Sequence, residues 1–356
     1  MNGQRRKLRV LVAEDSPVAR LLMVHLLNED PEIEVVAEAA DGHEAVLLAA
    51  RSGPDVIVMD VMMPTTNGLE ATRTIMTQMP TPIVLVTATH DPDDRMSFNA
   101  LQAGALVLLA KPPGPQATTF GQEAAAFRMT VKLMAEVKLV RRRATRQPEP
   151  APAAPPAAPS ALRGRTVEIV AIAASTGGPA ALAAILGALP ATTPVPILVV
   201  QHITVGFHQG LVDWLGSVSE LDVRLAVDGE PLRAGQALVA PADSHLGVDG
   251  HGRVSLSSDP PIGGHRPSAT HLFRSVADRY GSGAVGTILT GMGDDGVAGL
   301  RTLKEAGGLV LAQDESTSVV YGMPREAAVL GVVDQILPVG QMARALTSTW
   351  NGGRSR

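Results

Sequence analysis

Twelve residues near the middle of the chain contain almost nothing but proline and alanine: residues 148–159 hold six prolines, five alanines and one glutamate. Proline fixes φ and lacks a backbone N–H, so this stretch favours an extended polyproline II conformation. At about 3.1 Å per residue, such a stretch spans roughly 37 Å. The segment therefore predicts a linker, and we expect the 356 residues of the chain to form two domains.

Short apolar runs alternate with helical patterns on both sides of this linker. Continuous apolar runs predict buried strands of a parallel sheet covered on both faces. The expected fold class is therefore α/β, with two doubly wound parallel-sheet domains. Apolar residues at helical spacing also predict a helix over residues 122–146. The expected strands are residues 8–13, 33–37, 55–59, 83–86 and 106–109 before the linker, and 167–173, 197–201, 286–289 and 309–312 after it.

Composition and charge exclude several classes of function. The net charge is −5, and no basic excess is present that would neutralise nucleic-acid phosphates. The chain has no cysteine, which excludes disulfides and cysteine metal sites and favours a reducing compartment. The apolar run 8–13 is too short for a signal peptide, and no run reaches the roughly 18 residues of a membrane span. We expect a cytoplasmic protein that neither binds nucleic acid nor inserts into a membrane.

Five polar residues follow the expected strands of the first domain: Glu14, Asp15, Asp60, Thr87 and Lys111. The carboxyl ends of parallel strands meet at one edge of a sheet, where ligands bind. Three carboxylates at one place repel each other unless a cation joins them, and oxygen ligands suit Mg²⁺. Asp60 would accept a phosphoryl group whose oxygens Lys111 and Thr87 bind. Each acid alone could equally cap a helix, but five matching positions favour the site.

Over residues 7–125 the chain resembles the receiver domains of two-component response regulators, which have a flavodoxin-like fold. The resemblance lies in residues 13–16, 59–64, 67–68 and 110–112 (Ala-Glu-Asp-Ser, Met-Asp-Val-Met-Met-Pro, Asn-Gly and Ala-Lys-Pro). It implies phosphorylation of Asp60 by a histidine kinase, with Mg²⁺ held by Glu14, Asp15 and Asp60. The sequence departs from many receivers at Leu108, where an aromatic switch residue is common. An aromatic relay is therefore less firmly implied than phosphorylation.

In the second domain, Ser175, His202 and Asp295 each follow an expected strand. Ser175 occupies a tight turn with small neighbours between a strand and a helix, a position typical of a nucleophile. Together the three could supply the nucleophile, general base and orienting carboxylate of a serine hydrolase. From its own segment alone, Ser175 is equally well explained as a helix N-cap.

A dinucleotide site is a second interpretation of the same domain, because Gly291-x-Gly293-x-x-Gly296 follows a strand and precedes a helix. Asp294 and Asp295 would repel the pyrophosphate, which favours the carboxylate role. The histidines at 245, 251, 265 and 271 lack metal-site spacing, so we interpret most of them as surface or structural residues.

Residues 165–345 resemble the catalytic domain of chemotaxis protein-glutamate methylesterases. The matching segments are 171–179, 200–202, 240–241 with His245, 266–268, 289–296, 312–315 and 321–324. The resemblance implies a Rossmann-like esterase in which Ser175 is the nucleophile, His202 the base and Asp295 the third triad member, with Thr176 and Met292 near the oxyanion. Asp294 stands where asparagine is frequent in this family.

The resemblance also implies an organisation and a biological role. The expected order is a receiver domain over residues 7–125, a helix extension and linker over 126–164, and a methylesterase domain over 165–348. The substrates implied are glutamyl methyl esters, and also glutamines, of chemoreceptors, with no cofactor in the esterase domain. A non-enzymatic, phosphorylation-dependent binding module is the alternative, which intact Ser175, His202 and Asp295 argue against.

Overall fold

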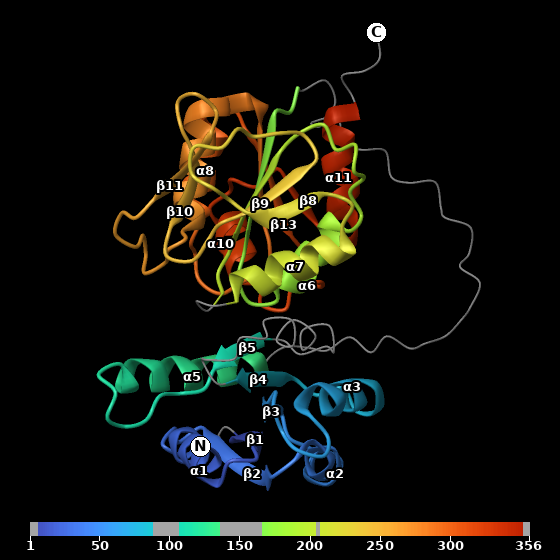
Figure 1. Cartoon of the computed structure of the whole chain (residues 1–356), viewed down its shortest axis with the longest axis vertical. Coiled ribbons are helices and arrows are strands. Elements are labelled where there is room, and N and C mark those ends of the chain that lie inside the picture. Colours follow the sequence, from blue (N-terminus) through green and yellow to red (C-terminus); the bar gives the residue numbers. More distant parts are fainter. Residues whose placement is uncertain (1–5, 88–106, 136–165, 204–206, 352–356) are drawn as a thin grey trace, which may run out of the picture. The chain divides into compact units, whose positions relative to one another are not determined.

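The computed structural model describes residues 6–87, 107–135, 166–203 and 207–351. The chain divides into two compact units near residue 141, and each is described by itself (Figure 1). Among the described residues, no helix is long and apolar enough to cross a membrane. The linker predicted at residues 148–159 lies outside the described residues.

The first unit is a five-stranded parallel sheet with the strand order β2-β1-β3-β4-β5. The strands β1, β3 and β4 are almost wholly buried, as expected for a sheet covered on both faces. The strands are β1 (Leu8–Ala13), β2 (Ile33–Ala39), β3 (Val56–Asp60), β4 (Ile83–Thr87) and β5 (Val107–Ala110), and the helices are α1 (Pro17–Asn28), α2 (Gly42–Ser52), α3 (Gly68–Gln78) and α5 (Phe120–Ala135).

Capping residues and a glycine in the sequence determine where the helices of this unit begin. Ser16, Asp41 and Asn67 are N-caps whose side chains accept a backbone N–H of the first turn. Gly68 opens α3, and a Cβ at this position would lie 2.1 Å from the Asp60 carbonyl oxygen. Only glycine therefore lets α3 begin so close to the end of β3.

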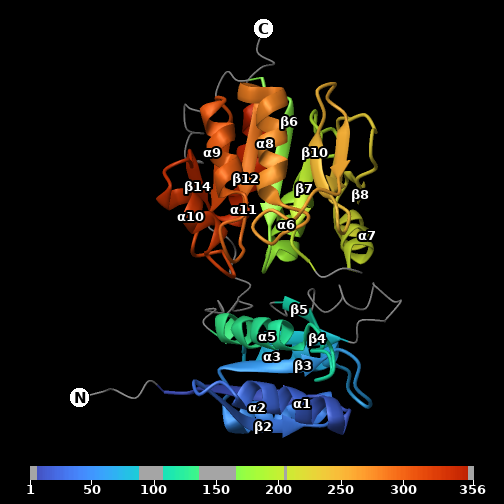
Figure 2. The ribbon, with the colours of Figure 1, turned by 90° about the vertical axis from the view of Figure 1, so that its left-hand side faces the viewer.

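The second unit is a seven-stranded parallel sheet with the strand order β14-β13-β12-β6-β7-β9-β8. The antiparallel hairpin β10-β11 lies outside this sheet (Figure 2). The strands are β6 (Ile169–Ala174), β7 (Ile197–Gln201), β8 (Asp222–Leu225), β9 (Gln236–Val239), β10 (His245–Val248), β11 (Val254–Ser257), β12 (Ala284–Ile288), β13 (Leu309–Gln313) and β14 (Gln335–Leu337).

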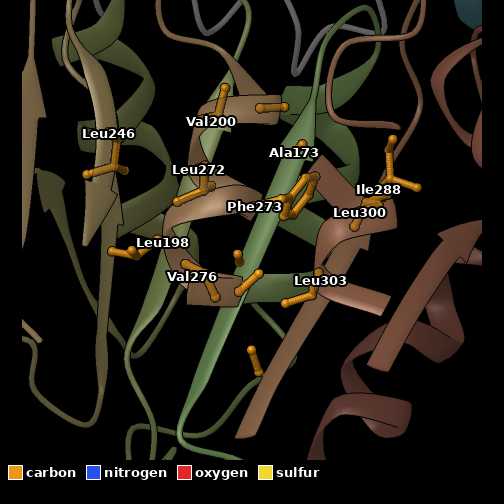
Figure 3. Close-up of a cluster of buried hydrophobic side chains, with 14 of the residues drawn as sticks. Ala173, Leu198, Val200, Leu246, Leu272, Phe273, Val276, Ile288, Leu300 and Leu303 are labelled. Carbon is orange, nitrogen blue, oxygen red and sulfur yellow. The ribbon is translucent and has the colours of Figure 1, made fainter. Parts of the chain in front are cut away.

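The helices of the second unit connect these strands and pack on the sheet. Figure 3 shows Phe273 of α8 among apolar side chains of the strands and of α9. A Cβ on Gly299 would approach Phe273 to 2.8 Å, so glycine permits close contact between α8 and α9. The helices are α6 (Gly178–Leu186), α7 (His208–Val218), α8 (Ala269–Tyr280), α9 (Val297–Glu305), α10 (Met323–Val329) and α11 (Val339–Asn351), and a short 3-10 turn, η2 (Gly281–Gly283), precedes β12.

The structure confirms the fold class and places a strand at every position where the sequence predicts one, with shifts of one or two residues at the ends. The helix predicted over residues 122–146 is described as α5, Phe120–Ala135; its remainder lies outside the described residues. The sequence did not predict β8, β9, β10, β11 or β14. These strands have three or four residues each, which is too short for a clear period.

Candidate active site

The five polar residues predicted in the first unit all lie at the carboxyl edge of its sheet. Glu14 and Asp15 follow β1, and Asp60 and Thr87 are the last residues of β3 and β4. Lys111 follows β5, and its Nζ lies 2.9 Å from both a Glu14 and an Asp60 carboxylate oxygen. The Lys111 N–H also donates to the Thr87 carbonyl at 2.9 Å. The convergence predicted from the carboxyl ends of the strands is thus present.

This edge brings three carboxylates together, of which Glu14 and Asp60 are buried and Asp15 is exposed. Glu14, Asp15 and Asp60 each offer a carboxylate oxygen, and these oxygens lie within 4.8 Å of one another. Burial raises the pKa of Glu14 and Asp60, and the hydrogen bonds from Lys111 only partly offset it. Because one ammonium faces three carboxylates, a divalent cation fits the site. The donor set therefore agrees with the expected Mg²⁺.

Leu108 lies in β5, where the sequence departs from many receivers. It is partly buried and packs against the core cluster of this unit. The aliphatic side chain at this position therefore contributes to the packing of the unit.

In the second unit, Ser175 lies in a tight turn between β6 and α6. The next glycine, Gly177, has φ 77° and is the N-cap residue of α6, so the turn uses a left-handed conformation that glycine adopts without strain. The Ser175 N–H donates to the Thr290 carbonyl at 3.0 Å. A Cβ on Gly291 would lie 2.7 Å from the Ser175 Cβ. The serine is thus packed against the loop that follows β12.

His202 follows β7, the strand next to β6. Ala174 pairs with Gln201 in the parallel register, and the His202 N–H donates to the Ala174 carbonyl at 2.9 Å. Ser175 and His202 therefore follow paired strand positions. The His202 Nε2 lies 2.9 Å from an Asp295 carboxylate oxygen.

The two ring nitrogens of His202 differ in their hydrogen bonding. An ionised carboxylate can only accept, so Nε2 carries the proton and Nδ1 is the basic nitrogen. Nδ1 is buried and has no hydrogen-bond partner among the described residues. The ring is therefore in the tautomer that a general base needs.

Asp295 is held at the N-terminus of α8. Its carboxylate accepts the Ser268 hydroxyl at 2.8 Å and the Ala269 and Thr270 N–H groups at 2.7 and 3.0 Å. Burial would raise the pKa of Asp295, but the hydrogen bond from His202, the positive charge of that ring when it is protonated, and the hydrogen bonds from Ser268 and Ala269 hold it well below the ordinary value. The helix N-terminus favours the same ionised form.

Asp294 and Asp295 are adjacent but differ in environment, since Asp294 is exposed and Asp295 is buried. Asp295 accepts hydrogen bonds from two backbone N–H groups of α8 and pairs with the His202 ring, an arrangement expected of an orienting carboxylate. The glycine-rich loop that suggested a dinucleotide site thus places this acid beside His202.

Thr176 and Met292 flank the serine turn. The Thr290 hydroxyl donates to the Thr176 carbonyl at 2.8 Å, which ties the turn to the loop containing Met292. The Met292 side chain is 39% exposed, and the neighbouring Gly291 forms a bridge with Tyr321. Both predicted residues therefore lie in the loops around Ser175.

The sequence did not assign His265 to the site. Its ring stacks on His202 with centroids 4.1 Å apart and an interplanar angle of 6°. Burial and the nearby His202 lower the pKa of His265, so its neutral form is favoured. The available signal was its position immediately before Arg266-Pro267-Ser268, one of the segments that matched the family.

Two other histidines of the unit support the structure behind Asp295. His245 is fully buried and accepts the Ser268 N–H at 3.2 Å, and its ring stacks on His271. Their position behind Ser268 agrees with the structural role expected for most of the scattered histidines.

Comparisons with known proteins agree with this geometry. The CheB methylesterase family model matches residues 170–346, and that of response regulator receiver domains matches residues 10–119. The chain is 51% identical over 345 residues to protein-glutamate methylesterase/protein-glutamine glutaminase 4 of Myxococcus xanthus, covering 97% of this chain and 98% of that protein. A homologue of the same name, numbered 3, from Anaeromyxobacter dehalogenans is 51% identical over 343 residues, covering 95% and 98%.

A solved structure supports the assignment of the second unit. The crystal structure of the Thermotoga maritima CheB methylesterase catalytic domain is 40% identical, with a TM-score of 0.50, and covers 51% of this chain and 97% of that one. With relatives matched over nearly their whole length and both domain models present, this chain belongs to the CheB family of protein-glutamate methylesterases/protein-glutamine glutaminases, whose members combine a receiver domain with a methylesterase domain.

Proposed function

We propose that this chain is a serine esterase, activated by phosphorylation, that hydrolyses glutamyl methyl esters on chemoreceptors for adaptation in chemotaxis-type signalling. The observation that carries the proposal is the His202–Asp295 pair of 2.9 Å on the strand end next to Ser175. The near full-length similarity to protein-glutamate methylesterases supports the same activity. Because the substrates are cytoplasmic domains of receptors, we place the protein in the cytoplasm.

In the proposed reaction, the Ser175 hydroxyl attacks the ester carbonyl while His202 Nδ1 takes its proton. The tetrahedral oxyanion forms near Thr176 and Met292, where amide groups could donate to it. His202 then returns the proton to the leaving methoxide, and methanol departs. Water attacks the acyl-serine with His202 again as base, which frees the glutamate and restores Ser175.

The same acyl-serine chemistry accounts for deamidation of receptor glutamines, which we propose as a second activity. In that reaction the leaving group is ammonia, and the product is the same glutamate. Asp295 would hold the His202 ring in its basic tautomer in both reactions, and its ionised carboxylate stabilises the imidazolium that forms.

Control of this activity is assigned to the first unit. We propose that Asp60 accepts a phosphoryl group from a histidine kinase and that Lys111 and Thr87 bind its oxygens. Glu14, Asp15 and Asp60 would hold Mg²⁺, which neutralises charge at the phosphoryl group. The proposed bounds are residues 7–125 for the receiver, 126–164 for the helix extension and linker, and 165–348 for the esterase. In the resting form the receiver would restrict access of receptors to Ser175.

Methanol release from methylated receptor membranes tests the proposal. The full chain, Ser175→Ala and Asp60→Asn are compared with and without Mg²⁺ and acetyl phosphate. We expect Ser175→Ala to lower turnover by about four to six powers of ten, and stimulation by acetyl phosphate to vanish in Asp60→Asn. If Ser175→Ala keeps most of the activity, the proposed nucleophile is wrong. If no chain releases methanol under any condition, the phosphorylation-dependent binding module becomes the better explanation.

A further inference from the structure

We propose that Gln201 is a positioning residue that fixes the nucleophile and the base relative to each other through a single side-chain amide. This inference rests on the proposed roles of Ser175 and His202. Gln201 lies in the matching segment 200–202, but neither the sequence analysis nor the triad geometry gives it a role. Gln201 is the last residue of β7 and is 2% exposed. It is therefore a buried polar side chain at the edge where the site lies.

The two hydrogens of the Gln201 amide go to the two catalytic residues. Nε2 donates to the Ser175 carbonyl at 2.8 Å and to the His202 carbonyl at 2.8 Å. The Ser175 carbonyl also accepts the Gly178 N–H at 2.8 Å, so Gln201 joins the serine turn, α6 and the His202 backbone. One planar group thus sets the separation of two residues that belong to different strand ends.

The orientation of the carboxamide follows from its partners. Two carbonyl oxygens require donors, so the NH₂ group must face them and Oε1 must point away. Oε1 is buried and has no hydrogen-bond partner among the described residues. A buried acceptor without a partner is unfavourable. The N-terminus of α6 lies beside it, and the positive end of that helix dipole compensates in part.

Gly178 makes room for this arrangement. A Cβ at Gly178 would lie 2.0 Å from the Gln201 Oε1 and 2.9 Å from its Cδ. Any other residue at the start of α6 would displace the carboxamide. The Gly177-Gly178 pair therefore serves two needs: the first glycine makes the turn, and the second admits the side chain of Gln201.

A structural alternative is that Gln201 merely fills space in the sheet. Gln236 of β9 offers a matched comparison, because it is also buried, also has an Oε1 without a partner among the described residues, and donates one hydrogen bond to Asp222. Gln236 begins its strand, so it lies at the amino edge of the parallel sheet, opposite the edge that bears Ser175. If replacing a buried glutamine only destabilises the fold, the substitutions at Gln201 and Gln236 should lower stability and activity to a similar extent.

The test measures methanol release by the full chain carrying either Gln201→Met or Gln236→Met. For each variant we measure Tm, kcat, KM and the pH dependence of kcat/KM. We expect both variants to lose comparable Tm. Only Gln201→Met should lose kcat, by about 10- to 100-fold, with KM within about twofold, because positioning of the acyl-transfer groups matters in the transition state. The pH dependence of kcat/KM should also change in Gln201→Met alone, because the base is no longer held in a fixed position.

Gly178→Ala is the second variant, in case Gln201→Met fails to fold. It keeps the glutamine but displaces its carboxamide, so it should reproduce the loss of kcat. In a chain that already carries Gln201→Met, Gly178→Ala should lower kcat less than in the wild type, because the carboxamide contact is already lost and the contact with the Ala174 Cβ, at 2.7 Å, is common to both chains. Additive losses would contradict the shared contact.

Ser175→Ala, measured in parallel, separates failure of this inference from failure of the proposed function. Inactive Ser175→Ala together with wild-type kcat in Gln201→Met would overturn the positioning role and leave the triad intact. Active Ser175→Ala would overturn the triad itself. Equal losses in the Gln201 and Gln236 variants would assign Gln201 a structural role only.

Discussion

The two units place their polar residues at the same topological position, yet give their carboxylates opposite electrostatic environments. In the receiver unit, Glu14 and Asp60 share one cation, Lys111, and burial raises the pKa of both acids. In the esterase unit, Asp295 is equally enclosed, but hydrogen bonds from His202, Ser268 and Ala269 overcome burial and lower its pKa.

This difference shows how one architecture supports two kinds of chemistry. A parallel sheet brings side chains to its carboxyl edge, but it does not determine their charge state. In the receiver, like charges gather without enough donors, which suits a site that takes a divalent cation and a phosphoryl group. In the esterase, one carboxylate receives four donors, which suits a permanent anion that orients a histidine.

Among changes to the carboxylates compared above, the largest expected effect comes from removing the charge of Asp295. Asp295→Asn should lower kcat by about three to four powers of ten, because an amide cannot fix the basic tautomer of His202 or stabilise its imidazolium. Methanol release from methylated receptor membranes measures it. Asp294→Asn is the matched control: Asp294 is exposed, so we expect kcat within about threefold of the wild type, as for most surface changes. Equal losses of kcat in Asp295→Asn and Asp294→Asn would mean that Asp295 does not act as the orienting carboxylate.

The sequence predicted the residues of both sites that directly follow long, continuous apolar strands. Asp60, Thr87, Ser175 and His202 were found because a parallel sheet brings the ends of such strands together. His265 and Ser268 were not, because they follow the hairpin β10-β11 of short, mixed-polarity strands, and only the folded chain brings them to His202 and Asp295. The opposite pKa shifts of Asp60 and Asp295 were also beyond the sequence, since they depend on burial and on donors far away in the chain.

The second effect tests whether the receiver controls the esterase. Acetyl phosphate with Mg²⁺ should raise methanol release by the full chain about tenfold. This corresponds to a shift of about 1.4 kcal/mol in the equilibrium between the proposed resting form, in which the receiver restricts access to Ser175, and the active form. Asp60→Asn should remove this stimulation and keep the basal rate. Deleting residues 1–147 should raise the basal rate without any phosphodonor. A truncated chain with unchanged basal activity would mean that the receiver does not inhibit.

A third effect follows from the lowered pKa of Asp295. Its pKa in the folded chain lies below the ordinary value of 3.8. The ionised carboxylate therefore stabilises the fold fully at pH values above 3.8. This stabilisation is lost progressively as the pH falls toward the pKa of the folded state. Between pH 5 and pH 3, the free energy of unfolding of the esterase unit should fall by about 1 kcal/mol more in the wild type than in Asp295→Asn. Urea unfolding followed by tryptophan fluorescence suits the measurement, since both tryptophans, Trp214 and Trp350, belong to this unit. Parallel pH curves for the two chains would contradict the ionised, hydrogen-bonded state of Asp295.

The smallest expected effect concerns the cation of the receiver. The Lys111 ammonium lies 2.9 Å from Glu14 and Asp60 oxygens. It therefore interacts with the same carboxylates that would bind Mg²⁺, and the two cations would repel each other. Lys111→Met should therefore raise Mg²⁺ affinity about threefold, measured by titration calorimetry, even though it weakens phosphorylation of Asp60 by removing a partner for the phosphoryl oxygens. Lys132→Met is the matched control, because Lys132 also pairs with two carboxylates, those of Asp30 and Glu32, but away from the sheet edge. An increase in Mg²⁺ affinity in Lys111→Met alone would support a receiver edge that has too little positive charge for its carboxylates. Unchanged affinity in both variants would mean that Lys111 does not compete with the metal. The electrostatic contrast with the Asp295 site would then be smaller than proposed.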